Sequence, residues 1–251
     1  DTRVASGVAA YDVADDALVG PDTILAGWTT LRHAPGDVEG HNVVAIRLPD
    51  GVDAAALVAA FDTARAIPLG GVALGGTDAR AEEVVVHLTP GRVVITCVSR
   101  SADGRRHGAR GEWRAVSVVS RANGAPEPLA PQTTIDVEMG DFAFLTAEHW
   151  GAGERFVRVR NTGRQDHLLL LARLRDGKRL ADAVEDDDAA DPAIGVWRVG
   201  PGETAYLPVR LSPGRYILVC LVPDPASGRT HQELGMMREI QVVTLVAQPN
   251  G

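Results

Sequence analysis

Short stretches in which apolar and β-branched residues alternate with polar ones recur along most of the chain. Such alternation, bounded by Gly and Pro turn signals, is typical of half-buried β-strands. The pattern predicts strands over residues 8–13, 28–32, 43–48, 83–88, 93–98, 114–119, 133–139, 156–160, 168–173, 205–211, 216–221 and 239–246. Many short strands joined by Gly/Pro turns favour an all-β fold built from β-sandwiches.

Two segments break the strand pattern. Residues 53–66 are rich in Ala, begin at Asp53 and place Leu57, Phe61 and Ala64 along one face, which predicts a helix. Residues 178–184 form a shorter counterpart that runs into an acidic stretch. Each segment follows the strand after a His and precedes the next pair of strands. We therefore expect one short helical insertion in each of two similar regions.

The landmarks of the first half recur in the second half in the same order. They recur 126, 123 and 124 residues later, as the pairs His41 and His167, Cys97 and Cys220, and His107 and His231. Thr89-Pro90-Gly91-Arg92 likewise matches Ser212-Pro213-Gly214-Arg215. This register predicts a tandem repeat of one domain. The expected division is a first domain over 1–121, a Pro-rich linker over 122–132 and a second domain over 133–251.

Composition narrows the classes of function. The net charge of −8 argues against nucleic acid as a partner, and no apolar run approaches the ~20 residues that cross a bilayer. The chain starts at Asp1 without a Met or signal peptide, which favours the processed end of an exported protein, periplasmic or extracellular; the alternative is numbering that starts within a longer chain. Because the two Cys occupy equivalent repeat positions, we expect two free thiols rather than one disulfide.

The second copy contains a set of metal-ligand residues. Two imidazoles, a thiolate and a thioether come from His167, Cys220, His231 and Met236. A His₂Cys set with a weak axial Met suits copper that alternates between two oxidation states. Met237 competes with Met236 for the axial place, and the match of Gly111 with Gly235 favours Met236. A buried core Cys and hydrogen-bonding His residues are the alternative interpretation.

These residues carry a resemblance to a known family. Asn161-Thr162-Gly163, His167, the run GRYILVCLVP, His231 and Gly235-Met236 resemble the cupredoxins, the blue copper fold of plastocyanins and azurins. The resemblance implies tandem Greek-key sandwiches, a type 1 copper site at His167, Cys220, His231 and Met236, and one-electron transfer. The Cys–His spacing, with ten intervening residues, is similar to the longer loop of nitrite reductases. His231, on this loop, is the expected point of electron exit.

The first copy offers a different donor set. The corresponding residues are His41, Cys97, His107 and Glu112. A hard carboxylate in place of the Met would favour Cu(II) or admit zinc. The same loop carries Arg100, Arg105, Arg106 and Arg110, whose charges would repel a metal ion. A second metal site and a degenerate copy retained for packing therefore both stay open.

Several functions remain in competition. The resemblance implies that a trinuclear oxidase needs His-X-His and His-Cys-His motifs, which this sequence lacks, so neither that activity nor nitrite reduction is expected. The leading hypothesis is an electron carrier that acts with a redox partner protein. A copper carrier with an acceptor, and a metal-free structural or interaction module, are the alternatives. A homo-oligomer is also compatible with the sequence.

Other groups are interpreted as structural. The acidic run 185–188 with Asp191 is expected to be a solvated loop that could steer a basic partner. His33 and His87 are expected to face solvent, and His149-Trp150 to form a surface corner. Gly70-Gly71 and Gly75-Gly76 are expected to be turns.

Overall fold

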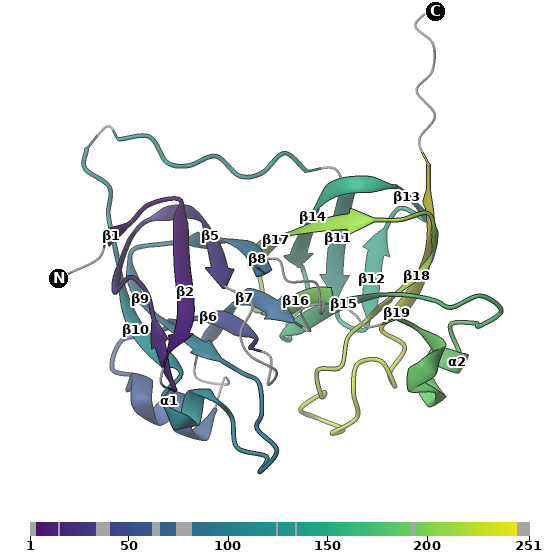
Figure 1. Ribbon diagram of the computed structural model, residues 1–251, viewed down its shortest axis with the longest axis horizontal. Helices are drawn as coiled ribbons and strands as arrows, with labels where there is room; N and C mark the ends of the chain where they lie inside the picture. The colour runs from purple at the N-terminus through teal and green to yellow at the C-terminus, as the bar shows by residue number, and fades with distance from the viewer. Residues whose placement is uncertain are drawn as a thin grey trace, which may run out of the picture.

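The computed structural model describes residues 4–14, 16–33, 41–61, 66–73, 82–123, 125–133, 135–191 and 194–244. Two β-sheets pack face to face through both halves of the chain, with short helical segments at the periphery (Figure 1). In the first half the elements are β1 (Val4–Ala5), β2 (Val8–Ala14), β3 (Ala17–Val19), β4 (Thr23–Leu25), β5 (Gly27–His33), β6 (Val43–Leu48), α1 (Ala54–Ala60), β7 (Ile67–Ala73), β8 (Glu82–Leu88), β9 (Gly91–Cys97), η2 (Gly108–Arg110) and β10 (Trp113–Val119).

The second half repeats this order. Its elements are β11 (Ile135–Gly140), β12 (Ala143–Thr146), β13 (His149–Gly151), β14 (Gly153–Asn161), β15 (His167–Arg173), α2 (Asp182–Glu185), η3 (Asp187–Ala189), β16 (Ile194–Val199), β17 (Thr204–Leu211), β18 (Gly214–Val219) and β19 (Met237–Val243). The larger sheet runs β1-β4-β10-β9-β6-β7-β16-β15-β18-β19-β13, and the smaller runs β12-β11-β14-β17-β8-β5-β2-β3. The predicted fold class, an all-β tandem of sandwiches with a short helical insertion in each copy, is confirmed.

Both sheets continue from one half into the other. In the larger sheet β7 pairs antiparallel with β16, with Leu69 opposite Val199 and Val72 opposite Val196. In the smaller sheet β8 pairs antiparallel with β17. In each half these two strands are the first and second after the helical insertion, so each strand meets its own counterpart. The division of the chain at residues 122–132 stays a prediction.

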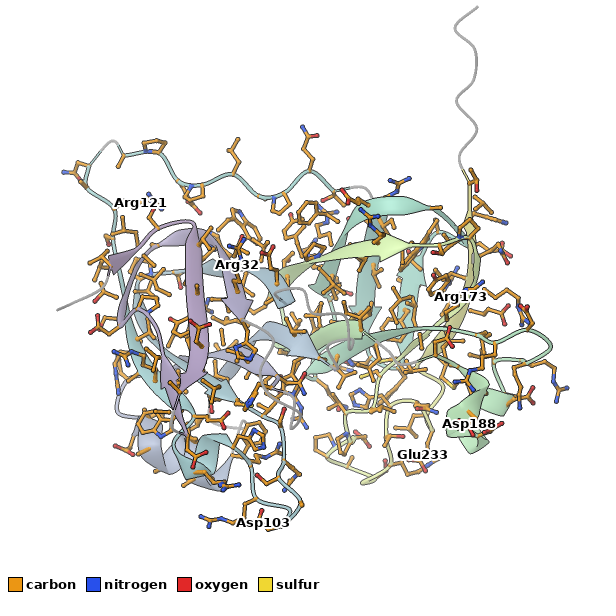
Figure 2. All side chains as sticks on the ribbon, viewed as in Figure 1. Arg32, Asp103, Arg121, Arg173, Asp188 and Glu233 are labelled. Atoms are coloured by element: carbon orange, nitrogen blue, oxygen red, sulfur yellow. The ribbon has the colours of Figure 1, made fainter. Side chains whose placement is uncertain are left out.

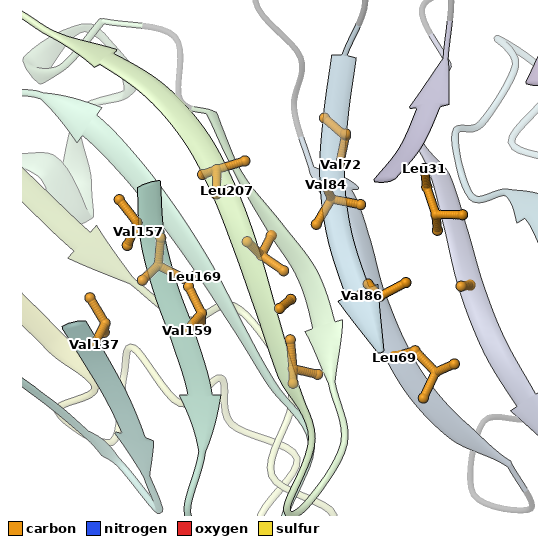
Figure 3. Packing of buried hydrophobic residues seen from close by; sticks show 14 of the residues in the cluster. Leu31, Leu69, Val72, Val84, Val86, Val137, Val157, Val159, Leu169 and Leu207 are labelled. Carbon is orange, nitrogen blue, oxygen red and sulfur yellow. The ribbon is translucent and has the colours of Figure 1, made fainter. Parts of the chain in front are cut away.

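The main core lies between the two sheets and spans both halves (Figure 3). Inward-facing aliphatic side chains at alternate strand positions fill it, as the alternation in the sequence indicates. Those labelled in Figure 3 include Leu31, Val84, Val86, Val137, Val157, Leu169 and Leu207. A second cluster lies on the outer face of the larger sheet, where Leu57 and Val58 of α1 pack over Val44 and Ile46. Strand β6 is therefore buried on both faces and lacks alternation.

The predicted strands match observed ones with shifts of a few residues at their ends. The observed strands that were not expected are β1, β3, β4, β7, β12, β13 and β16. The turn expected at Gly70-Gly71 is wrong, because both residues lie inside β7. A Cβ on Gly71 would lie 2.5 Å from the Val44 Cα, so glycine permits the close approach of β6. Gly75-Gly76 lies outside the described residues.

The predicted helix over 53–66 is shorter than expected. Asp53 caps it by accepting a hydrogen bond from the Ala56 backbone N–H, as its position suggested. The helix ends at Ala60 because Phe61 adopts a left-handed conformation with φ 50°. Residues 62–65 lie outside the described part of the chain.

Two expectations about surface residues are also wrong. His33 is 3% exposed, and its Nδ1 lies 3.0 Å from the Tyr11 carbonyl oxygen. Trp150 is buried in β13, and its indole N–H donates to Thr146, while His149 is exposed. His87 is partly exposed and contacts Glu127. Across the described ranges, the helices are all too short or too polar to serve as membrane spans.

Candidate metal centres

The four predicted donors of the second copy come from three segments at one end of the sandwich. His167 begins β15, Cys220 follows β18, and His231 and Met236 lie in the loop before β19. Strands β15 and β18 are antiparallel neighbours, with Leu170 opposite Val219, which brings the first two donors together. All four side chains have 0% exposure. The sheet therefore gathers residues that lie far apart in the sequence.

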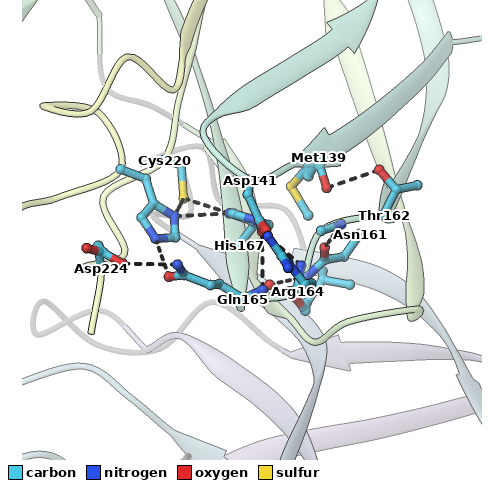
Figure 4. A network of polar contacts seen from close by, with 12 residues as sticks. Met139, Asp141, Asn161, Thr162, Arg164, Gln165, His167, Cys220 and Asp224 are labelled. Carbon is cyan, nitrogen blue, oxygen red and sulfur yellow. Dashed lines mark hydrogen bonds and ion pairs between the residues drawn. The ribbon is translucent and has the colours of Figure 1, made fainter. Parts of the chain in front are cut away.

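The donor atoms of three of them converge on one point (Figure 4). His167 Nδ1 lies 3.0 Å from His231 Nδ1, and Cys220 Sγ lies 4.0 Å and 3.4 Å from these two nitrogens. An ion about 2.0 Å from each nitrogen and about 2.3 Å from the sulfur leaves its donors at most ~4.3 Å apart. The spacing of His167, Cys220 and His231 thus fits a single metal ion.

The outer nitrogen of each imidazole contacts a hydrogen-bond acceptor. His167 Nε2 lies 3.2 Å from Asp141 Oδ1, and His231 Nε2 lies 3.0 Å from Gln165 Oε1. Because an acceptor requires a donor, both rings carry their proton on Nε2 and direct an Nδ1 lone pair at the cluster. Metal-bound histidines are held in this manner, by a second group that fixes the tautomer.

The orientation of Gln165 is itself fixed. Its amide Nε2 donates to Asp224 Oδ1 at 3.0 Å, so its oxygen must face His231. Hydrogen bonds from the Ser227 hydroxyl and from Gln165 lower the pKa of Asp224 to about 2, so this carboxylate is ionised and accepts only. A chain of three residues therefore sets which nitrogen of His231 faces the metal position.

A tight turn between β11 and β12 supports both imidazoles. Its Asp141 accepts from His167, and its Phe142 packs edge-on against the His231 ring at 5.2 Å. Burial alone would raise the pKa of Asp141, but hydrogen bonds from the Arg164 amide, the His167 ring and the Gln165 amide together lower it. Phe142 has φ 65°, a strained conformation for a non-glycine residue.

The Asn161-Thr162-Gly163 motif completes this support. The Asn161 side chain donates to the carbonyls of Gln165 and Val199 at 2.7 Å, and its oxygen accepts from the Gly163 N–H. A Cβ on Gly163 would lie 2.4 Å from Asp141 Oδ1 and 2.7 Å from His167 Nε2. Glycine is needed here because the Asp141–His167 contact passes directly over its Cα.

Burial of the cluster favours neutral imidazoles and a neutral thiol. The sulfur becomes an anion here only when a bound cation stabilises it. Burial lowers the pKa of both His167 and His231, and it raises the pKa of Cys220 to about 11. The Leu168 backbone N–H lies 3.4 Å from Cys220 Sγ and donates to it. The thiol is therefore inert unless a metal ion replaces its proton.

The ligand loop holds Met236 beside the other three donors through its backbone. The Met236 N–H donates to the His231 carbonyl at 2.8 Å, and the Cys220 N–H donates to the Met236 carbonyl at 3.3 Å. Met236 is fully buried, whereas Met237 is partly exposed and begins β19. Of the two candidates for the axial place, Met236 is thus the buried one, and its backbone contacts His231 and Cys220.

The expectation that electrons leave through His231 stays a prediction. The loop is exposed, but the imidazole itself has 0% exposure and lies behind Gln165 and Phe142. Both of these covering residues are partly exposed. His231 therefore contacts two residues that themselves reach solvent.

The first copy forms an equivalent cluster. His41 Nδ1 lies 2.8 Å from Glu112 Oε2 and 3.3 Å from His107 Nδ1. Cys97 Sγ lies 3.7 Å from each of the two imidazole nitrogens. All four residues are buried, and their donor atoms lie within 4.8 Å of one another. The structure thus brings together the complete set that the repeat indicated.

The arginines of the neighbouring loop make contacts away from this cluster. Arg106 donates to the Val98 carbonyl and stacks 3.8 Å over the Phe61 ring. Arg100 donates to the Gly104 carbonyl and Arg110 to the Ser101 hydroxyl. Asp103 marks the outer tip of this loop (Figure 2). Three of the four arginines therefore contact neutral groups, which fixes their side chains but leaves their charges in place.

Ion pairs neutralise part of the negative charge of the acidic segment in the second half. Lys178 pairs with Asp186 at 2.7 Å, Arg179 pairs with Asp182, and Arg175 lies near Asp191. Asp188 projects from the periphery of the molecule beside α2 (Figure 2). These pairs reduce the field that the acidic run would exert on a basic partner.

Comparisons with known proteins give structural neighbours only. No family model and no curated protein matches the chain. A reduced auracyanin from Roseiflexus castenholzii has a TM-score of 0.33 and 22% identity, over 45% of this chain and 99% of the other. Auracyanin A from Chloroflexus aurantiacus, described as a blue copper protein, has 22% identity and a TM-score of 0.33, over 44% and 98%.

A nitrite reductase from Thermus scotoductus covers 96% of this chain, which spans 62% of that enzyme, at 10% identity and a TM-score of 0.25. These neighbours are copper proteins, as the sequence resemblance implied. Likenesses at such low TM-scores do not carry a function across, so the chemistry has to be argued from the side chains of this protein.

Proposed function

We propose that this chain is a copper-binding electron-transfer protein whose working site is His167, Cys220, His231 and Met236. The observation that carries the proposal is the convergence of two imidazole lone pairs and a thiol in a fully buried position. Two lone pairs directed at each other at 3.0 Å are unfavourable unless a cation or a proton lies between them. A bound copper ion would supply the gain and loss of one electron.

The protein's own contribution is to hold these ligands still. Asp141 and the Asp224–Gln165 pair fix the two imidazoles from outside, and backbone hydrogen bonds fix the ligand loop. Ligands fixed in this way rearrange little when the charge at the centre changes. Single-electron exchange with a redox partner protein requires a rigid site from which water is excluded. The proposal includes an exported location for the protein.

Burial favours an electron carrier over a copper carrier. A protein that hands its metal to an acceptor needs a ligand that the acceptor can reach, yet the four side chains have 0% exposure. A metal-free structural module would have no use for two orientated imidazoles beside a buried thiol. Within the described residues, His, Cys and carboxylate donors gather in the two clusters alone, which offers no support for a trinuclear oxidase.

The test compares two matched substitutions, Cys220→Ser and Cys97→Ser. Each purified variant is loaded with Cu(II), dialysed and examined for retained copper and for an intense thiolate-to-copper absorption band in the visible range. In Cys97→Ser the band should persist and should bleach when one electron per chain is added, whereas no band that bleaches in this way should remain in Cys220→Ser. A colourless Cys97→Ser protein that retains no copper would refute the proposal.

A further inference from the structure

The two clusters differ in one donor at one fixed place. The Glu112 N–H donates to the His107 carbonyl at 3.2 Å, and the Cys97 N–H donates to the Glu112 carbonyl at 2.9 Å. Met236 makes the same two backbone contacts with His231 and Cys220. The first half therefore has a carboxylate where the second half has a thioether, and the backbone hydrogen bonds around the two residues are the same.

The carboxylate of Glu112 is directed into the cluster. Its Oε2 lies 2.8 Å from His41 Nδ1 and 3.5 Å from His107 Nδ1, and the Glu112 side chain is 6% exposed. Charged groups are seldom buried this deeply without a partner, because removing a carboxylate from water is costly. Hard oxygen donors also prefer cations of higher charge than soft sulfur donors do.

The charges of the ligands differ accordingly. A thiolate and a carboxylate together carry two negative charges, which a divalent ion neutralises. The second cluster contributes only a thiolate, which a monovalent ion neutralises. Asp141 does not alter this count, since it lies outside the donor set, its side chain is 23% exposed and it contacts Arg164. A buried site disfavours net charge, so each cluster favours an ion of a different charge.

We propose that His41, Cys97, His107 and Glu112 form a second metal site, built for a divalent ion that keeps its charge when the copper of the second half is reduced. Zn²⁺ and Cu²⁺ both accept two imidazoles, a thiolate and a carboxylate. Cys97 Sγ lies 3.7 Å from each of the two imidazole nitrogens, a spacing that one bound ion can bridge. This site does not depend on the electron-transfer role proposed above.

The experiment uses the full chain with Cys220→Ser, which removes the thiolate of the other cluster. Zn²⁺ and Cu²⁺ are titrated separately by calorimetry, and retained metal is counted after dialysis. We expect one divalent ion per chain, at least tenfold weaker binding of either ion after Glu112→Gln, and Cu²⁺ that resists ascorbate. Glu112→Met, which copies the second cluster, should retain copper but allow ascorbate to reduce it.

Three results would overturn the proposal: no divalent ion retained by Cys220→Ser, equal affinity in Glu112→Gln, or equal reduction by ascorbate with and without Glu112. Circular dichroism of each variant shows whether it is folded. If a variant is misfolded, the metal count of the unsubstituted chain, which should be two, still tests the proposal. Failure of the electron-transfer proposal would be seen separately, in the Cys97→Ser chain.

Discussion

Replacing Gly163 by Ala tests how the second cluster is held without altering any ligand. The added Cβ would lie 2.4 Å from Asp141 Oδ1 and 2.7 Å from His167 Nε2, where about 3.4 Å is ordinary contact. Asp141 Oδ1 must therefore retreat by about 1.0 Å and His167 Nε2 by about 0.7 Å. That displacement is enough to break their 3.2 Å hydrogen bond and release the imidazole from its orientation.

The expected loss is about 10- to 100-fold in copper affinity, the usual effect of removing a group that orients a metal-bound histidine. This corresponds to about 1.4–2.8 kcal/mol of binding free energy. Competition with a colorimetric Cu(I) chelator measures it. Because the substitution displaces Asp141 and also contacts the His167 ring directly, the loss in the double variant with Asp141→Ala should be smaller than the sum of the two single losses.

Gly140 provides the matched control, since it lies in the same hairpin and its nearest potential contact is the Ala143 oxygen at 4.0 Å. Gly140→Ala should leave copper affinity unchanged. Unaltered affinity in Gly163→Ala, or an equal loss in both variants, would refute the assignment of Asp141 as the group that orients His167.

Three further expectations follow from the structure. Gln165→Leu removes the acceptor of His231 Nε2 and should weaken copper binding by about tenfold, whereas Gln165→Glu, which keeps an acceptor, should lose less in the same competition assay. Folding lowers the pKa of Asp224 to about 2, so this carboxylate stabilises the fold above about pH 4, and its contribution is lost as the pH falls towards 2. The difference in urea midpoint between the unsubstituted chain and Asp224→Asn should therefore shrink between about pH 4 and pH 2. A constant difference would contradict this expectation. Leu69→Ala, at a 1% exposed position opposite Val199, should cost about 2–5 kcal/mol and lower one common unfolding transition of both halves in calorimetry, while two separate transitions would count against the shared sheets.

Much of the architecture could be predicted from local pattern alone. Strands such as β5 and β11 alternate between buried and more exposed positions, so their sequences reveal both where the strand lies and which side chains face the core. Strands β7 and β16 were missed because neither alternates: β7 contains Pro68 and two glycines, and β16 has three consecutive buried residues. Their pairing joins segments that are more than one hundred residues apart, which no local window detects.

The ligands were predictable because duplication showed them twice. The groups that orient them were not: Asp141, Gln165 and Asp224 are ordinary polar loop residues until the fold places them around His167 and His231. The only signal in the sequence was the short stretch from Asn161 to His167, which already contains Gln165. His33 was misjudged because its position in β5 faces inward, against the His41 ring.

The pairing of β7 with β16 and of β8 with β17 determines how the two halves of the chain are related by symmetry. Equivalent strands that meet antiparallel are related by a local two-fold axis, the arrangement found in dimers of identical subunits. A polypeptide carrying one copy alone would leave two strand edges unpaired and could satisfy them with another molecule of itself. The two halves are thus arranged like the subunits of a symmetric homodimer, with both halves carried by one chain.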